Sequence, residues 1–238
     1  MVAERGERWG AMKHWGACSS VRKSVEWRRW ILEEAKEQQC YSGFSLGCTN
    51  DFPTLVLVFP KLMAPKWLVL PFFWVPQFWQ SQSMLHGSRI YSQKHMDWIK
   101  WGFMTETAGN VTDYTRVRAD VQGLSREYGI QELAIDRAFQ GDQMAIQLFN
   151  EDGIKIIPFG QGFLSMAAPS KRFEELVLSG KLEHGNNPIL EQMAANITIV
   201  TDVAGNMKPW VPLNSATLGW NGLTATIMAI GRAMANED

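Results

Sequence analysis

The sequence predicts an α/β domain with a mixed sheet that carries helices on both faces. Two observations lead to this fold class. Three apolar strands follow one another with only short turns between them, which is typical of an antiparallel meander. The rest of the chain then alternates between amphipathic helices and short buried strands, which is typical of parallel strands joined by helices.

The meander comes first. We expect its strands at residues 41–46, 54–59 and 67–75. The segments Thr49-Asn50-Asp51 and Ala64-Pro65 separate them, and both are rich in turn-forming residues. The region from Thr54 to Trp79 is strongly apolar, but its lysines and prolines favour buried strands over a membrane-spanning helix.

The alternating part has clear helix signals. An amphipathic segment lies at residues 95–103, and Thr112-Asp113 is a good N-cap for a helix through Tyr128. We expect further strands at 131–135, 154–158 and 197–201. Further helices are expected at 142–150, from Pro169-Ser170 to Gly180, after Pro188, and at 222–234. This order is compatible with a ribonuclease H-like fold.

Composition excludes some classes of function. The net charge of −1 gives no general attraction to nucleic acid, so DNA contact would need a local basic surface. The three cysteines form no Cys-x-x-Cys pair and the four histidines have no zinc spacing, which indicates a reducing compartment and no structural metal. The N-terminus lacks the apolar segment of a secretory signal, so we expect a protein that is not secreted.

Residues 1–39 differ from the rest because tryptophans are interleaved with basic residues. Such a segment can bind nucleic acid through phosphate contacts and base stacking. It can also be a helical linker, from Val25 to Gln38, that docks its tryptophans on the body of the protein or on a neighbouring domain. We therefore divide the chain into an N-terminal extension, residues 1–39, and one α/β domain, residues 40–238.

The candidate site centres on Asp136, which ends a short apolar strand and would lie at the rim of the sheet. A helix cap or a turn is the alternative role for this acid. Nucleases that use two divalent ions need carboxylates from several elements, because the ions stand about 3.5–4 Å apart. The other expected positions, on the first strand and the last helix, hold the neutral Ser45 and Asn221.

Other residues near these elements are further candidates for binding a metal or a phosphate. Asp51 and Asp142 could supply a missing charge, although a solvated turn or helix surface explains both. The loop with His184 and Asn187 could contact a phosphate of the substrate, or it could simply form a turn. The segment Gly160-Gln161-Gly162 lacks the Lys-Ser or Lys-Thr of a nucleotide-binding loop, so we expect no ATP site.

Many ordered motifs resemble those of one known family. They are Cys40-Tyr41-Ser42-Gly43, Val56-Leu57-Val58-Phe59-Pro60, Leu70-Pro71-Phe72-Phe73-Trp74-Val75-Pro76, Gly109-Asn110-Val111-Thr112-Asp113-Tyr114, Ala134-Ile135-Asp136-Arg137, Pro158-Phe159-Gly160-Gln161-Gly162-Phe163, Leu176-Val177-Leu178-Ser179-Gly180-Lys181-Leu182, His184-Gly185-Asn186-Asn187-Pro188, Asp202 with Ala204-Gly205-Asn206-Met207-Lys208-Pro209, and Ile227-Met228-Ala229-Ile230-Gly231-Arg232-Ala233. Residues 40–238 resemble the C-terminal nuclease domain of the large terminase subunit of tailed bacteriophages.

The resemblance implies a ribonuclease H-like fold and a magnesium- or manganese-dependent endonuclease that acts on duplex DNA during DNA packaging. The family's first acid, in a Gly-Leu-Asp-Leu pattern, falls on Ser45. Its second acid falls on Asp136, and its third, in an Ile-Asp-Gly pattern, falls on Asn221. The resemblance therefore implies Asp136 as a metal ligand, with Ser45 and Asn221 as weakened catalytic positions. Asp51, across the turn, is the other candidate metal ligand, on its position alone.

These substitutions lead us to expect weak or absent cleavage. The alternative is a non-catalytic module that docks on DNA or on the portal, or a prophage remnant. Residues 1–39 are too few for the packaging ATPase, so we expect a separate ATPase domain as a partner, together with the portal protein and the small terminase subunit. The expected location is the host bacterial cytoplasm, with no membrane association.

Overall fold

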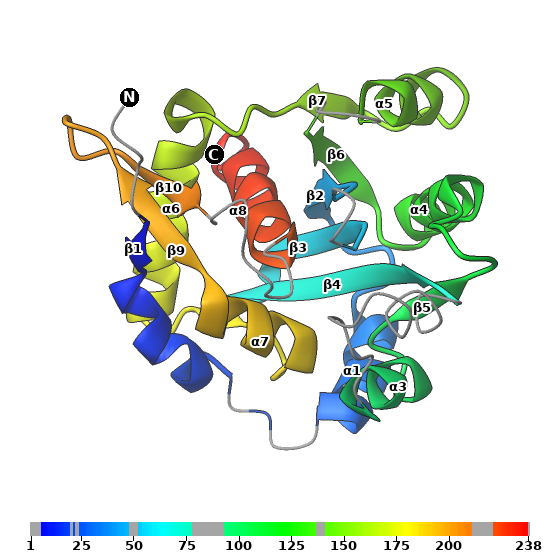
Figure 1. Cartoon of the computed structure of the whole chain (residues 1–238), viewed down its shortest axis with the longest axis horizontal. Helices are drawn as coiled ribbons and strands as arrows, with labels where there is room; N and C mark the ends of the chain where they lie inside the picture. Colours follow the sequence, from blue (N-terminus) through cyan, green and yellow to red (C-terminus); the bar gives the residue numbers. More distant parts are fainter. Residues whose placement is uncertain are drawn as a thin grey trace.

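The computed structural model describes residues 6–19, 21, 24–47, 52–77, 93–136, 141–210 and 221–237. Its main sheet is mixed and has the strand order β5-β4-β3-β2-β6-β7 (Figure 1). A further strand, β8, pairs with β4. A smaller sheet has the order β1-β9-β10. The predicted α/β class with a mixed sheet is confirmed.

The meander is formed by β2 (Cys40–Ser45), β3 (Thr54–Met63) and β4 (Lys66–Pro76), which pair antiparallel. On the other side of β2, the strands β6 (Ile130–Ile135) and β7 (Ile156–Pro158) pair in parallel. Two short strands, β5 (Thr105–Thr107) and β8 (Leu182–Glu183), pair in parallel with opposite ends of β4. The first strand of the meander therefore lies in the middle of the sheet, because it pairs with β3 on one side and with β6 on the other.

Helices cover both faces of the main sheet. One face packs against α6 (Phe163–Leu178), α7 (Pro188–Asn196), α8 (Asn221–Met234) and the 3-10 helix η1 (Gly10–Ala17). The other packs against α1 (Ser24–Glu34), α4 (Tyr114–Glu127) and α5 (Gly141–Asn150). Alternation along β3 divides the two cores, because Val56 faces the first and Leu55 the second. A further helix, α3 (Gln93–Lys100), precedes β5.

The predicted start of one helix is wrong. The sequence suggests that it begins at Pro169-Ser170, because proline favours the first turn, but α6 begins at Phe163 and holds Pro169 in its interior. Met166 and Ala167 lie before the proline and are buried in the core. Their packing stabilises a turn that the proline by itself disfavours.

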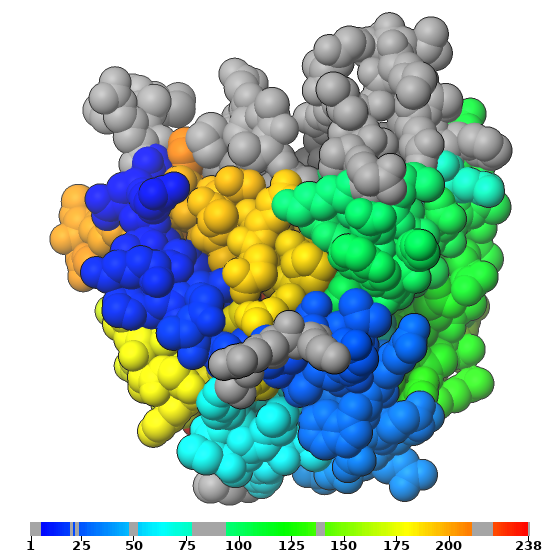
Figure 2. All heavy atoms as spheres, turned by 90° about the horizontal axis from the view of Figure 1, so that it is seen from below, coloured from blue at the N-terminus to red at the C-terminus, as the bar shows by residue number. Residues whose placement is uncertain are grey.

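The described part of the N-terminal segment packs on the body of the protein. Strand β1 (Glu7–Arg8) pairs with β9 (Thr198–Thr201), which in turn pairs with β10 (Met207–Trp210). Trp9 and Trp15 are buried against Phe173, and the Trp9 ring nitrogen donates to Glu174 at 2.8 Å. Figure 2 shows this segment, in blue, lying along α7 in gold. Docking therefore accounts for these two tryptophans.

No helix within the described ranges is long and apolar enough to cross a membrane. The apolar region from Thr54 onward forms β3 and β4, as predicted.

Candidate functional site

The first two candidate residues stand at the ends of neighbouring strands. Strand β2 pairs in parallel with β6, and Phe44 lies opposite Ile135 in this pairing. The next residues along the two strands are Ser45 and Asp136, so both positions reach the same edge of the sheet. This is the edge at the carboxyl ends of the parallel strands, where α/β proteins usually bind ligands.

Helix α8 brings the third candidate to that edge by crossing the sheet diagonally. At its start, the Asn221 amide donates to the carbonyl of Phe52, just before β3. At its last turn, Arg232 donates to Glu132 near the start of β6 at 2.6 Å. Between them the helix touches β2 so closely that a Cβ added at Gly43 would lie 2.0 Å from the Ala225 carbonyl oxygen. Glycine is required at this crossing.

Side-chain alternation puts the candidates on the same face as well. Gly43 faces α8, and Ser45 lies two residues further along the same strand. Ala134 belongs to the core under α8, and Asp136 follows it by the same interval. The structure therefore brings positions 45, 136 and 221 together at one edge, on the side covered by α8.

This edge carries little charge in the part of the chain that the structure describes. Ser45 and Asn221 are each 7% exposed and neutral, and Asp136 is partly exposed. No group of three or more His, Cys, Asp or Glu residues that could hold a metal ion is found among the described residues. Asp51 lies outside those residues, and Asp142 is exposed in the first turn of α5.

The other two candidates, His184 and Asn187, lie elsewhere. They follow β8, which pairs with the start of β4 at Trp67 and Leu68. The Ser45 edge is near the far end of β4, because Thr54 pairs with both Ser45 and Phe73. Five residues of strand separate these ends, which corresponds to about 17 Å. The register thus does not bring His184 and Asn187 to Asp136.

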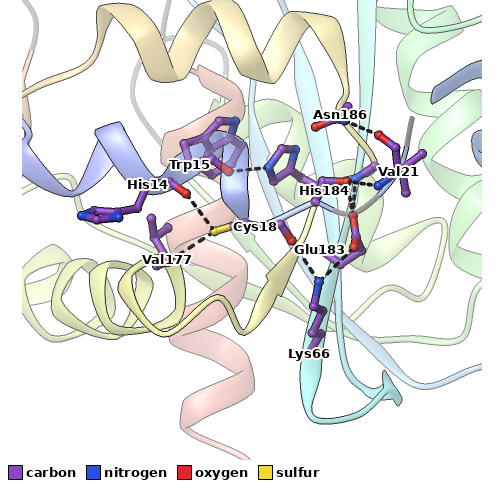
Figure 3. Close-up of polar contacts among 11 residues, drawn as sticks. His14, Trp15, Cys18, Val21, Lys66, Val177, Glu183, His184 and Asn186 are labelled. Carbon is purple, nitrogen blue, oxygen red and sulfur yellow. Dashed lines mark hydrogen bonds and ion pairs between the residues drawn. The ribbon is translucent and has the colours of Figure 1, made fainter. Parts of the chain in front are cut away.

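Both residues have structural contacts in this second region. The Asn187 side chain caps α7 by accepting from the backbone of Ile189 at 3.0 Å and of Leu190 at 3.1 Å. The His184 ring stacks on Trp15 with centroids 4.1 Å apart, and its Nε2 lies 3.1 Å from the Trp15 carbonyl oxygen (Figure 3). Burial lowers the pKa of His184 to about 4, so the ring is neutral near pH 7.

A buried carboxylate next to His184 was not singled out from the sequence. Glu183 is 1% exposed and accepts from Ser19 at 2.5 Å, from Lys66 at 3.3 Å and from the Gly185 backbone at 3.0 Å. Figure 3 shows Lys66 reaching Glu183 from below, where it also approaches the Cys18 carbonyl. We call Ser19, Lys66, Glu183 and His184 the β8 cluster. The polar sequence around Glu183, Lys181-Leu182-Glu183-His184-Gly185, gives no signal that this carboxylate is buried.

Two residues beside Asn221 were also missed. The Phe52 carbonyl accepts from Asn221 at 3.2 Å and from the Thr54 hydroxyl at 3.0 Å, and both side chains are buried. No sequence motif identifies a backbone carbonyl as a shared acceptor, so only the folded chain could reveal it.

The fold and this edge define a class of protein, a ribonuclease H-like domain whose candidate site lies at the carboxyl ends of parallel strands. The family model for the terminase large subunit, endonuclease domain, matches residues 49–237. The chain belongs to this family.

Individual relatives agree with this assignment. The chain is 31% identical over 197 residues to the large terminase subunit of Enterobacteria phage HK97, covering 81% of this chain and 37% of the relative. It is 26% identical over 219 residues to protein YmfN of Escherichia coli K12, covering 90% of this chain and 48% of the relative. The chain therefore spans less than half the length of both curated relatives.

Solved structures support the same fold. The crystal structure of the HK97 large terminase matches with a TM-score of 0.73 and 27% identity over 93% of this chain and 42% of that chain. The nuclease of thermophilic phage G20c, solved with bound magnesium, matches with a TM-score of 0.52 over 82% of each chain. Identity to the G20c nuclease is only 13%, so this likeness shows the fold alone.

Proposed function

We propose that this chain is a terminase nuclease domain that binds duplex DNA during phage DNA packaging in the bacterial cytoplasm, with weak or absent cleavage. The observation that carries the proposal is the convergence of Ser45, Asp136 and Asn221 at one edge with a single carboxylate among them. Its partners would be those of the family's packaging complex, namely the portal protein, the small terminase subunit and an ATPase domain.

A basic residue near this edge supports contact with DNA. The loop after β7 continues from Phe159, whose backbone donates to Ile135 at 2.9 Å, and it therefore runs beside Asp136. Lys208 of β10 donates to the Gln161 carbonyl at 3.3 Å and lies 5.2 Å from the ring centroid of Phe163. A lysine held beside an exposed loop suits a phosphate of the DNA backbone.

The donor set fits one weakly held divalent cation better than two. Asp136 supplies one charged oxygen, whereas Ser45 supplies a hydroxyl and Asn221 an amide. Hard cations prefer charged oxygen ligands, and two divalent ions beside a phosphate need several carboxylates to offset their repulsion. Magnesium or manganese bound here would polarise a phosphate oxygen, and Asp136 would be its charged ligand.

A non-catalytic module that keeps the fold and docks on DNA or the portal is the second candidate. The bond between the Asn221 amide and Phe52 favours it, because this residue is engaged in holding the fold together. A prophage remnant would have the same features.

A plasmid-nicking assay with manganese tests the proposal. We expect nicking by the wild-type chain to be low, and Asp136→Ala to remove what remains. Glu34→Gln is the matched control, because Glu34 is an exposed acid of α1 on the opposite face. Binding of a short duplex, measured by fluorescence anisotropy, should weaken as salt concentration rises.

Two results would contradict the proposal. Robust cleavage that Asp136→Ala does not change would remove Asp136 from the site. A chain that neither binds duplex DNA nor nicks it would remove the nucleic-acid function altogether.

A further inference from the structure

The start of α8 is held by a contact that an acid at position 221 could not make. The Asn221 Nδ2 donates to the Phe52 carbonyl oxygen at 3.2 Å, across 169 residues of sequence, and the bond is buried. A carboxylate in the same rotamer would place an oxygen against that carbonyl oxygen. The attraction would become a repulsion, because neither group has a hydrogen to donate unless the carboxyl is protonated.

Helix α8 is closely packed near this contact. A Cβ added at Gly222 would lie 2.8 Å from Leu190 Cδ2 and 2.8 Å from Met193 Sδ. One turn later, the Ala225 carbonyl packs directly against Gly43 of β2. Protein interiors transmit strain at such close contacts, so the backbone contact at Gly43 limits how far α8 can shift toward the sheet.

The Phe52 carbonyl also links this contact to the strands of the site. It accepts from Thr54, the first residue of β3, and Thr54 pairs directly with Ser45. Asn221 thus connects the first turn of α8 to the edge where β2 ends. Acids on both elements would repel each other unless a divalent cation lay between them.

We infer that Asn221 is a positioning residue whose amide holds α8 on the Phe52 carbonyl in place of a shared cation, so that this edge is ordered without divalent metal. The inference rests on the proposed function, because that proposal identifies this edge as the candidate metal site of a nuclease domain. Two parts of the inference can be tested without measuring cleavage. One is the contribution of the Asn221 bond to stability, and the other is the independence of that stability from divalent metal.

Thermal unfolding at pH 7.5 in EDTA is the first test. We expect Asn221→Ala to lower the melting temperature of the full chain by about 3 °C, because one buried hydrogen bond is lost. Asn221→Asp should lower it by more, about 6 °C, because the repulsion adds to the loss. Lowering the pH toward 4 should recover part of this difference as the carboxyl gains a proton, whereas Asn221→Ala should show no such recovery.

A double-mutant cycle keeps the inference testable if Asn221→Asp does not fold. Thr54→Val removes the other donor to the Phe52 carbonyl with little change of shape. Because the two donors share one acceptor, Asn221→Ala and Thr54→Val together should destabilise by more than the sum of the single changes. Additive effects would mean that the two donors do not cooperate at Phe52, and would overturn the inference.

Metal dependence separates this inference from the proposed function. We expect manganese to leave the wild-type melting temperature within about 1 °C of its value in EDTA and to raise that of Asn221→Asp. A large manganese-dependent increase in the wild-type chain, or an Asn221→Asp variant as stable as wild type in EDTA, would overturn the inference. The nicking assay would still decide the proposed function, because wild-type cleavage is measured independently of these shifts.

Discussion

The two ends of β4 differ in how their polar groups are used. At the Ser45 end, Asp136 is partly exposed, and Ser45 and Asn221 are neutral. At the other end, the β8 cluster buries a carboxylate with a lysine, a hydroxyl and a backbone amide, and adds a histidine stacked on Trp15. A buried, densely bonded group stabilises a fold, whereas a partly exposed acid at a sheet edge can be reached from solvent.

The same contrast applies to His184, which is a candidate for phosphate contact from the sequence. A histidine in a loop with glycine, asparagine and proline has the composition of a catalytic loop, but here its ring is enclosed by the N-terminal segment. The residues that enclose it lie 169 positions away in the sequence. A histidine can serve in catalysis or in the packing of the core, and only the surroundings of its ring in the folded chain distinguish the two roles.

The largest expected effect is the loss of Glu183. Glu183→Ala should lower the melting temperature by about 10 °C, because it removes a buried carboxylate with its ion pair to the partly exposed Lys66 and leaves the donors Ser19 and Gly185 without their acceptor, a combined loss of roughly 3 kcal/mol. Thermal unfolding followed by circular dichroism would measure it, and Glu183→Gln should lose less because the amide can still accept from Ser19. An unchanged melting temperature would mean that the β8 cluster does not support the fold.

The next effect is a loss of stability in acid through His184. Its pKa is about 4 in the folded chain, whereas an unfolded histidine titrates near its ordinary value of 6.5. The unfolded state therefore binds the proton first, and stability falls as the pH drops from 6.5 toward 4, by about 3 kcal/mol at most. Urea unfolding at several pH values would measure this loss.

One neighbouring group opposes that trend. Burial raises the pKa of Glu191, whose Oε1 lies 3.5 Å from His184 Nδ1, so this carboxyl binds a proton more readily in the folded state. The net loss in acid is therefore smaller than His184 alone would give. His184→Gln should flatten the pH dependence in this window even if its overall stability is lower, and an equally steep dependence in that variant would assign the effect to other groups.

The smallest expected effect on stability is that of Asp136, at the Ser45 end of β4. Asp136→Asn should change the free energy of unfolding by less than about 1 kcal/mol, because a partly exposed side chain at an edge contributes little to packing. The same change should remove any manganese-dependent nicking. If Asp136→Asn instead destabilised the chain as much as Glu183→Ala does, Asp136 would be a structural residue like those of the β8 cluster.

Much of the fold could be predicted because its signals are local. The strands at 41–46, 54–59 and 67–75 are apolar runs between turns, and each overlaps a strand of the structure. Asp113 was recognised as an N-cap and does accept from the backbone of Thr115 and Arg116. The strands β1, β5 and β8 were missed because they are two or three residues long and pair with strands distant in sequence, and β10 was missed because it has only four residues.

The sequence by itself determined the family, the meander followed by parallel strands, and the identity of the single acid at Asp136. These depend on residue types and on their order along the chain. The tertiary structure alone decided that α8 crosses the sheet to place Asn221 beside the end of β2 and the start of β3, that Glu183 accepts from Ser19, and that His184 stacks on Trp15 of η1. The reason is that burial and hydrogen-bond partners depend on contacts between residues more than 150 positions apart, which leave no pattern in local sequence.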